Sequence, residues 1–556
     1  MSSGFFASHR ETLDKALRAI EERGYWSCYS EMPSGKIYGE TANDDGKAAV
    51  EARYNTYFDI DQPGTVGKVG SEVSPFGTKL GITYPKIDPN VLLPAMVKAS
   101  EAWGRASIDE RAGVCMEILS RLNKRSFEIA YAVHQTTGQP FMMAFQAGGP
   151  HAQDRGLEAV AYAYAEMKRV PATASWVKPQ GKNPPLSMVK TYHIVPRGVG
   201  LVIGCCTFPT WNGYPGFFAS LITGNAVLSK PHGGAILPVA LTVAIARDVL
   251  REAGFDPNVV CLAAEDVGGT LAPELALRPE VAIIDFTGSN ANGTWLETHA
   301  HQARVYTEKA GVNCIVIDSA QDFKSAARNI AFSLCLYTGQ MCTTPQNIFV
   351  PRDGINVEGG KLSFDDVAKA ICDGVAKMVS DPARAVEVLG AIQNEGVAER
   401  VARARGTGEI LLDSKKLEHP QYPGARVMTP LVVKLDAKKD AETYKQEWFG
   451  PVTFIIATDS TAESLKIATG LASERGAITF SVYSTDDKVL AAAEEAAIAG
   501  GVALSCNLLG GVFVNQSAAF SDYHATGANP AANSCLCDSD FVAGRFRVVQ
   551  SRKHAA

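Results

Sequence analysis

The sequence predicts an α/β protein whose parallel sheets are covered by helices, and three observations lead to this prediction. From about residue 198, short runs rich in β-branched residues alternate with helical stretches, a pattern typical of βαβ units. The same alternation begins again at about residue 311, which indicates a second α/β unit. The length of 556 residues leaves room for two or three domains with large buried cores.

The strands expected in both units are short and mostly apolar. In the first unit they are VGLVIGCC, NAVLSKP, NVVCLAA and VAIIDFTGS. The amphipathic run LPVALTVAIARDVLREAGF predicts a helix that ends at Gly254. In the second unit the expected strands include NCIVIDS, NIFVPRD, VTFIIATD and GAITFSVYS. Residues 90–170, before the first unit, are strongly helical in pattern.

The two ends of the chain have patterns of their own. A first helix is predicted to begin at a capping box formed by Ser8 and Glu11. The rest of residues 1–85 is rich in Gly, Asp and Pro, so we expect an irregular N-terminal arm. Residues 184–196 are expected to form a protruding hairpin, and the late run RFRVVQSRK a strand that pairs with a partner subunit.

Composition excludes several classes of function. The formal net charge of −6 leaves no basic footprint for nucleic acid, and no apolar run reaches the roughly 18 residues of a membrane span. The N-terminus does not have the pattern of a secretory signal. The twelve cysteines show no repeated CxxC, and no histidine pair has zinc spacing, so we expect no metal site and a reducing cytoplasmic location.

The run YTGQMCTTPQN places Cys342 in a polar, turn-prone setting rather than in an apolar core. A lone cysteine is usually a small buried hydrophobic residue, but these neighbours also suit a reactive thiol. Glu308 follows an apolar strand, where a carboxylate can serve as a general base or simply lie at the surface. In FTGSNANG, a glycine turn after a strand suits a phosphate, and Lys230 ends another strand. Each of these patterns alone leaves a structural role open.

Together, these motifs resemble the aldehyde dehydrogenase superfamily. They are Lys230-Pro231, FTGS at 286–289, Glu308, GQMC at 339–342 and EWFGP at 447–451. The interval from Glu308 to Cys342 is 342 − 308 = 34 residues, the usual spacing between base and nucleophile in that family. The resemblance runs from about residue 90 to the C-terminus, and the length, the arm and the run SDYHATGANPAAN are most similar to the PaaN-type dehydrogenases of phenylacetate degradation.

The resemblance implies a role for each matching residue. Cys342 would attack the aldehyde, and Glu308 would activate the water that hydrolyses the resulting thioester. It also implies an NAD(P)-binding site formed by Lys230, His232, Gly233, Phe286, Gly288, Ser289, Glu447 and Phe449. Three parts are implied as well: an NAD(P)-binding domain over 86–183 and 197–310, a catalytic domain over 311–540, and oligomerisation strands at 184–196 and 541–556, with 1–85 as the arm.

Two departures from the family pattern affect these expectations. Thr207 stands where most members have an asparagine whose amide helps hold the oxyanion, and Asn212 is a candidate substitute. Gly233 stands where NAD-preferring relatives often have a glutamate that binds the ribose diol. Because that glutamate would repel a 2′-phosphate, its absence favours NADP over NAD.

The expected function is NAD(P)-dependent oxidation of an aldehyde to a carboxylic acid, with a CoA-linked semialdehyde of aromatic catabolism as the expected substrate. A CoA-acylating dehydrogenase is one alternative, although Glu308 argues against it. A non-catalytic cofactor-binding relative is the other. The family implies a homodimer or homotetramer. Four residues are candidates for lining the substrate tunnel or for packing: Trp211, Tyr214, Phe520 and His524.

Overall fold

The computed structural model describes residues 2–309 and 311–555; the predicted boundary at 310 and the chain ends at 1 and 556 lie outside the described residues. A five-stranded parallel sheet forms the centre of the first half of the chain. Its order is β7-β6-β5-β8-β9, so β5 and β8 lie where the chain reverses its direction of travel across the sheet. The strands are β5 (Val199–Ile203), β6 (Ala226–Lys230), β7 (Val260–Leu262), β8 (Val281–Thr287) and β9 (Arg304–Glu308).

A seven-stranded sheet forms the second half, in the order β15-β18-β19-β12-β10-β20-β21. All neighbours are parallel except β15, which runs antiparallel to β18. The strands are β10 (Cys314–Ile317), β12 (Asn347–Pro351), β15 (Glu409–Leu412), β18 (Leu431–Asp436), β19 (Val452–Thr458), β20 (Thr479–Tyr483) and β21 (Ala503–Cys506). The predicted α/β class and the strands predicted for both units are confirmed.

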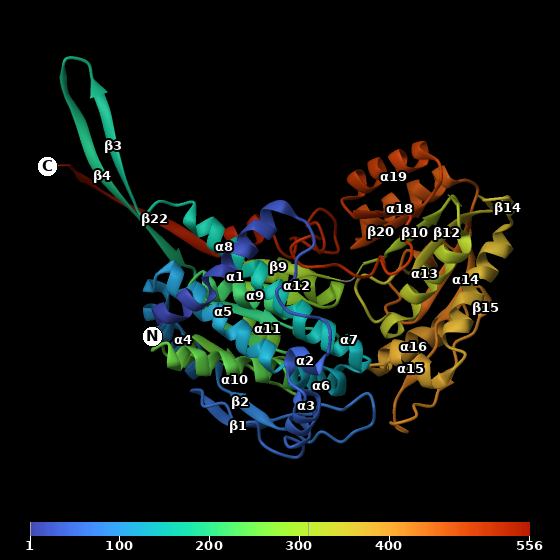
Figure 1. The fold of residues 1–556 in the computed structure, drawn as a ribbon, viewed down its shortest axis with the longest axis horizontal. Coiled ribbons are helices and arrows are strands. Elements are labelled where there is room, and N and C mark those ends of the chain that lie inside the picture. Colours follow the sequence, from blue (N-terminus) through green and yellow to red (C-terminus); the bar gives the residue numbers. More distant parts are fainter. Residues whose placement is uncertain (1, 310, 556) are drawn as a thin grey trace.

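Helices cover both sheets, and the two halves lie side by side (Figure 1). The main helices of the first half are α4 (Pro89–Arg105), α5 (Ile108–Lys124), α6 (Ser126–Thr137), α7 (Phe141–Gln146), α8 (Ala152–Lys168), α9 (Gly213–Ile222), α10 (Leu237–Glu252), α11 (Leu271–Ala276) and α12 (Asn290–His299). Those of the second half are α13 (Phe323–Cys335), α14 (Phe364–Met378), α15 (Pro382–Leu389), α16 (Glu395–Ala404), α17 (Ala441–Tyr444), α18 (Thr461–Arg475) and α19 (Asp487–Gly500). The late helix α20 (Ser539–Ala543) packs against α8 in the first half.

The N-terminal arm packs tightly against the first half. Its first helix, α1 (Ser2–Glu22), lies on α5 and α8, with Leu13 and Ala16 fully buried. The predicted capping box is wrong, because α1 begins at Ser2 and the Ser8 hydroxyl donates to the Gly4 carbonyl inside the helix. The arm continues through α2 (Gly35–Tyr38), α3 (Ala42–Glu51), β1 (Thr65–Val69) and β2 (Tyr84–Ile87). Glu72 fastens it by accepting the backbone N–H groups of Ile236 and Leu237 at the start of α10.

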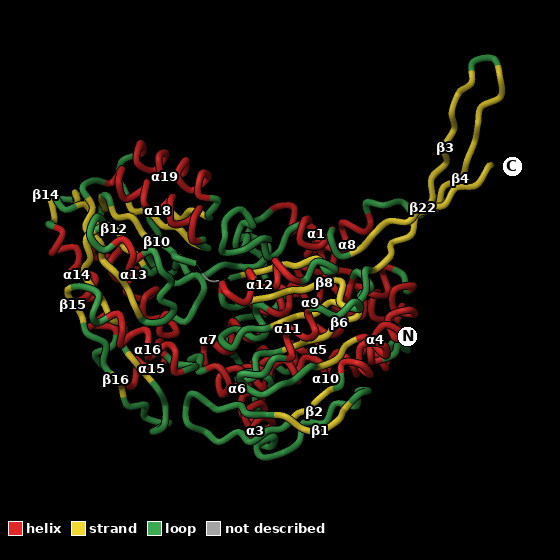
Figure 2. The backbone as a smooth tube through the Cα atoms, turned by 180° about the vertical axis from the view of Figure 1, so that it is seen from behind, coloured by secondary structure: helices red, strands yellow, loops and turns green. Residues whose placement is uncertain are grey.

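A three-stranded antiparallel sheet extends away from both halves (Figure 2). It consists of β3 (Thr173–Gln180), β4 (Asn183–Pro196) and β22 (Phe546–His554), with β4 in the middle. The segment 184–196 is therefore one strand, and the hairpin is formed with 173–180, which the prediction had left in another domain. The C-terminal run pairs with 188–196 of the same chain. No helix in the described part of the chain is long and apolar enough to cross a membrane.

Short strands complete the fold. They are β11 (Ser319–Ala320), β13 (Ile355–Val357), β14 (Gly360–Leu362), β16 (Lys416–Leu417) and β17 (Val427–Met428).

Candidate active site

Cys342 lies in a turn between α13 and β12, and the backbone of that turn is unusual. Tyr337, Thr338 and Gly339 follow one another with φ of 50°, 53° and 65°. Two consecutive non-glycine residues in the left-handed region cost energy and persist only where the surroundings determine them. At Gly339 a Cβ would lie 2.4 Å from the Gly450 carbonyl oxygen, so only glycine fits there.

Buried side chains hold this turn in place. The Thr338 hydroxyl donates to the Leu389 carbonyl at 2.6 Å. The Gln340 amide donates to the Ala391 carbonyl at 3.1 Å and accepts the Gln393 N–H at 2.9 Å. The polar residues around Cys342 are thus structural supports inside the protein, because buried polar groups need such partners.

Asn313 connects the Cys342 turn to the neighbouring strand ends. Its amide N–H group donates to the carbonyls of Cys342 at 2.7 Å and Thr344 at 3.0 Å. Its carbonyl oxygen accepts the N–H groups of Ile478 and Thr479 at 2.9 and 3.0 Å. One buried amide therefore joins the segments that lead into β10, β12 and β20.

Glu308 ends β9 and lies opposite the Cys342 turn, so that the first half of the chain supplies the carboxylate and the second half the thiol. The Glu308 side chain is 3% exposed. It accepts the Asn212 amide at 3.2 Å and contacts His524 Nε2, also at 3.2 Å. The family resemblance predicted Glu308 and Cys342 as partners, and the structure brings both to one place.

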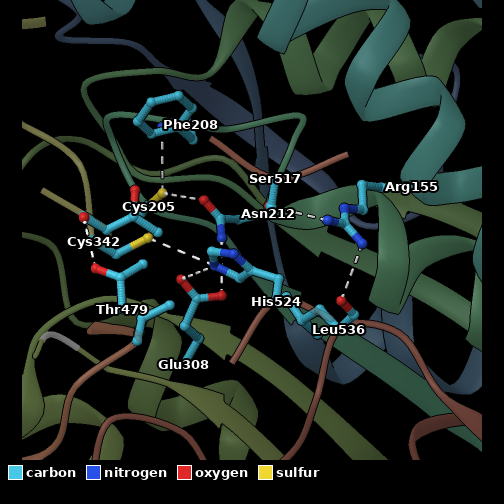
Figure 3. Close-up of polar contacts among 12 residues, drawn as sticks. Arg155, Cys205, Phe208, Asn212, Glu308, Cys342, Thr479, Ser517, His524 and Leu536 are labelled. Atoms are coloured by element: carbon cyan, nitrogen blue, oxygen red, sulfur yellow. Dashed lines mark hydrogen bonds and ion pairs between the residues drawn. The ribbon is translucent and has the colours of Figure 1, made fainter. Parts of the chain in front are cut away.

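His524 completes the cluster, as Figure 3 shows. Its Nε2 lies 3.7 Å from the Cys342 sulfur, and ligand atoms of His524, Glu308 and Cys342 lie within 4.8 Å of one another. The sequence predicts no metal, and the chemistry proposed below uses these three side chains without one.

The pKa values of Glu308 and Cys342 are shifted in opposite directions. Burial opposes the charged form of Glu308, but His524 and the hydrogen bonds to the carboxylate outweigh it, so the pKa of Glu308 is lowered. Burial and the neighbouring negative charge of Glu308 raise the pKa of the Cys342 thiol well above its ordinary value. In this arrangement Glu308 is ionised, and Cys342 keeps its proton until an acceptor removes it.

Thr207 and Asn212, the two candidates for the second oxyanion donor, lie differently. The Thr207 hydroxyl points to the Cys205 sulfur at 3.8 Å, and Thr207 is not among the described residues that line the cavity at Cys342. Asn212 lines that cavity beside Cys342 and His524. The structure thus brings Asn212, and not Thr207, to the cavity wall.

The cavity in front of Cys342 has a volume of about 710 Å³. Aromatic and methionine side chains form much of its wall, and no lysine or arginine is among its described lining residues. Of the four predicted tunnel residues, Trp211 and His524 line it, whereas Tyr214 and Phe520 are buried in the core. The wall also includes these residues of the N-terminal arm: Tyr25, Trp26, Ser27 and Glu31.

The carboxyl edge of the five-stranded sheet has the position in the fold that a dinucleotide site requires. In such sheets ligands bind outside the carboxyl ends of the strands at the point where strand order reverses, here between β5 and β8. Phe286 is near the end of β8, and Ser289 caps α12 by accepting the Asn292 N–H at 3.3 Å. A Cβ at Gly288 would lie 2.7 Å from the Phe286 ring. The predicted phosphate turn therefore stands at the amino end of a helix.

Lys230 ends β6, Glu265 follows the neighbouring strand β7, and their side chains form an ion pair. His232 is nearby, and burial together with the Lys230 charge lowers its pKa. A Cβ at Gly233 would lie 2.7 Å from the backbone of Asp266, so the site of the missing glutamate has no room for one.

Glu447 and Phe449 precede β19 in the second half. Loss of solvent raises the pKa of Glu447 to about 7, against the opposing charge of Arg400. The Arg400 side chain donates to the Phe449 carbonyl at 2.7 Å.

Sequence reasoning missed or undervalued three site residues. Asn313 and Glu265 were not singled out, and His524 was given no role beyond the tunnel wall. Asn313 directly precedes an apolar strand, in GVNCIV, which is the available signal for it. For His524 no local pattern exists, because its partners lie 182 and 216 residues away.

Known proteins share this fold. The model of the aldehyde dehydrogenase family matches residues 73–527. The crystal structure of an NAD-dependent aldehyde dehydrogenase from Burkholderia multivorans is 64% identical, covers 99% of each chain and has a TM-score of 0.98. N-succinylglutamate 5-semialdehyde dehydrogenase of Paraburkholderia xenovorans (strain LB400) is 29% identical over 381 residues, 67% of this chain and 72% of that protein. Benzaldehyde dehydrogenase (NAD+) of Pseudomonas putida is 26% identical over 417 residues, 72% and 78% of the two chains.

Proposed function

Because the chain belongs to the aldehyde dehydrogenase family and is an NAD(P)-dependent aldehyde dehydrogenase, we propose that it oxidises an apolar, aromatic aldehyde to the carboxylic acid in aromatic catabolism. The observation that carries this proposal is the meeting of Cys342 and Glu308 at one cavity. The PaaN-type resemblance supports the aromatic pathway, since the C-terminal run that carries it contains His524.

The proposed reaction uses Cys342 first and Glu308 second. The Cys342 sulfur attacks the aldehyde carbon and forms a thiohemiacetal. Bound NAD(P)+ supplies a hydride acceptor, which leaves the acyl group on sulfur as a thioester. Glu308, ionised because its pKa is lowered, then takes a proton from water, and the resulting hydroxide releases the acid.

For the oxyanion we propose the Cys342 backbone N–H and the Asn212 amide. An amide nitrogen has two hydrogens, so Asn212 can hold Glu308 with one and the oxyanion with the other. Loss of one such donor costs roughly 3 kcal/mol of transition-state stabilisation. We therefore propose Asn212, rather than Thr207, as the second oxyanion donor.

The geometry supports NAD over the NADP that Gly233 suggested. Glu265 places a carboxylate beside Lys230, where the predicted adenosine ribose would lie. A carboxylate there accepts hydrogen bonds from the ribose hydroxyls and repels a 2′-phosphate. If this is correct, Glu265→Gln raises kcat/KM with NADP relative to NAD.

The cavity supports an uncharged substrate. Phosphates bind to lysine, arginine or free backbone N–H groups, and no lysine or arginine is among the described lining residues. Trp211, Phe208 and Phe513 instead offer flat apolar surface. We therefore rank an aromatic aldehyde above the CoA-linked semialdehyde expected from the sequence.

Assembly and location are proposals as well. The projecting sheet exposes Val177, Val189 and Val549, which suits pairing with a second copy in a homodimer or homotetramer. All twelve cysteines are free thiols, as a cytoplasmic protein would have them.

The test is formation of reduced cofactor with a panel of aromatic, aliphatic and CoA-linked aldehydes, with NAD and NADP separately. We expect turnover with the aromatic members and none with Cys342→Ala. Turnover that requires free CoA would indicate the acylating alternative, and silence across the panel with intact cofactor binding would contradict the proposal.

A further inference from the structure

We propose that His524 is a catalytic residue, the base that removes the proton of Cys342 during attack on the aldehyde. This inference rests on the proposed function, because it concerns the first step of the same reaction. It assigns a role to a side chain that aldehyde oxidation by a thiol and a carboxylate does not by itself require.

The first argument is geometric. One nitrogen, His524 Nε2, faces both the Cys342 sulfur at 3.7 Å and Glu308 Oε1 at 3.2 Å. Hydrogen bonds to sulfur are long, so the first distance permits direct proton transfer, and the second lets Glu308 accept the resulting imidazolium proton. In a catalytic triad the nucleophile and the carboxylate contact different ring nitrogens, whereas here both contact Nε2, so the proton that Nε2 takes from the thiol is the one that Glu308 holds.

The second argument is the position of the ring. His524 is 3% exposed, and the backbone N–H and C=O of His524 both pair with Leu536, at 3.1 and 2.9 Å. The ring packs edge-to-face on Trp211, with centroids 4.6 Å apart. Phe520 and Ala525, on either side, have φ of 67° and 60°, in a region that bulky or β-carbon-bearing residues rarely adopt. The ring is therefore held in one orientation.

The third argument is the way the segment is anchored. The buried Arg155 guanidinium donates to the carbonyls of Asp522 at 3.0 Å and Leu536 at 3.3 Å, and to the Ser517 hydroxyl at 3.1 Å. Glu158 pairs with Arg155 at 2.8 Å. Figure 3 shows Arg155 on the far side of the loop from Cys342. The buried ion pair of Arg155 and Glu158 thus helps to fix the segment that presents His524.

Few other titratable groups surround the ring. Among the described residues these are Cys342 and Glu308 in contact, Cys205 behind Cys342, Arg155 beyond Trp211, and Asp522 on the same segment. Glu308 is ionised and hydrogen-bonds to the Cys342 side chain, so its carboxylate both stabilises imidazolium and competes with it for the thiol proton. The imidazole is the acceptor that we propose, and the Glu308→Gln variant separates the two.

The protons taken up and released in the proposed reaction balance. Neutral His524, with its own proton on Nδ1, takes the Cys342 proton on Nε2 as the S–C bond forms. Hydride leaves the carbon for NAD(P)+, and the thioester remains. Glu308 takes a proton from water, hydroxide attacks the carbonyl, and the C–S bond breaks. The departing thiolate regains its proton from His524, and Glu308 and the acid release one proton each to solvent.

The test is the pH dependence of Cys342 alkylation by iodoacetamide, followed by peptide mass spectrometry in the wild type, His524→Gln and Glu308→Gln. We expect the wild-type and Glu308→Gln rates to rise with pH, because only the neutral imidazole can accept the thiol proton. In His524→Gln this rise disappears, the rate at pH 7.5 falls roughly tenfold or more, and kcat/KM for aldehyde falls about 100-fold. The dissociation constant for NADH stays unchanged.

His419→Gln is the matched control, because His419 packs on Phe76 and Tyr422 and does not line the cavity. An unchanged pH profile in His524→Gln overturns the proposal. So does a variant that keeps the fast first turnover and loses only steady-state rate, because His524 would then act on hydrolysis. If His524→Gln does not fold, absence of the rise in Glu308→Gln is the overturning result. A wild type that alkylates as expected but oxidises no aldehyde refutes the proposed function and leaves this inference standing.

Discussion

Two segments meet at the Cys342 sulfur, and they are held in different ways. The turn at 336–344 has Tyr337, Thr338 and Gly339 in the left-handed region, and it is held by hydrogen bonds from Thr338 to the Leu389 carbonyl and from Tyr337 to the Thr137 carbonyl. The segment at 517–536 has no helix or strand, and Arg155 and Trp211 from the first half of the chain hold it. Both segments depend on residues far away in the sequence, but a short motif marks the turn and none marks the second segment.

The largest expected effect lies in the turn itself. Cys342→Ser keeps the shape but replaces the thiol with a much weaker nucleophile, so we expect steady-state turnover to fall roughly 10⁴-fold or more. Cofactor binding, measured by fluorescence titration, should not change. Cys506→Ser, at an exposed remote site, is the control and should retain full rate. Retained turnover in Cys342→Ser would show that the Cys342 thiol is not the nucleophile.

Arg155→Met breaks the support of the second segment. It leaves Glu158 buried without its cation, which should cost about 3–5 kcal/mol in the free energy of unfolding, measured by urea denaturation. The double variant Arg155→Met/Glu158→Gln should recover much of this stability but not kcat, because the carbonyls of Asp522 and Leu536 remain without their donor. Full recovery of kcat would show that Arg155 does not position His524.

Asn313→Ala is the corresponding change on the turn side. It removes four hydrogen bonds of a buried side chain at once, so we expect a loss of about 2–4 kcal/mol in the free energy of unfolding. The rate should fall as well, since the Cys342 carbonyl loses its anchor. Asn225→Ala, at another buried asparagine whose hydrogen-bond partners do not line the cavity, is the comparison variant and should lose stability without a comparable loss of rate.

The contrast between these two segments also explains which features could be predicted from the sequence. Repeated apolar runs predicted the sheets because burial of a parallel strand requires them locally. Cys342 and Glu308 were predictable because each lies in a short motif at fixed spacing. His524, Glu265 and the cavity-lining part of the arm were not, because their roles arise from packing between distant segments. Trp26, for example, contacts Phe520 edge-to-face at 4.7 Å.

The last prediction concerns the pH dependence of the free energy of unfolding, through a contact of the N-terminal arm. Asp154 accepts the Ser27 hydroxyl at 2.6 Å and the Cys28 N–H at 3.0 Å, yet burial raises its pKa to about 7 from 3.8. The folded state therefore binds this proton more tightly than the unfolded state, so the stabilisation is present below about pH 4 and is lost as pH rises to about 7.

Asp154→Asn should reduce the dependence of the free energy of unfolding on pH in this range. Relative to the wild type, the variant should gain roughly 4 kcal/mol between pH 4 and pH 8, measured by urea unfolding at each pH. A constant difference between the two proteins across this range would show that Asp154 does not titrate there.

The proposed reaction requires that an acyl group is carried on Cys342 and released by Glu308. The most direct measurement is mass spectrometry of Glu308→Gln after incubation with NAD and an aldehyde that the wild type oxidises. We predict one reduced cofactor per active site, and an acyl mass on the peptide that contains Cys342. Cofactor reduction without that mass, or the mass on another cysteine, would contradict the account.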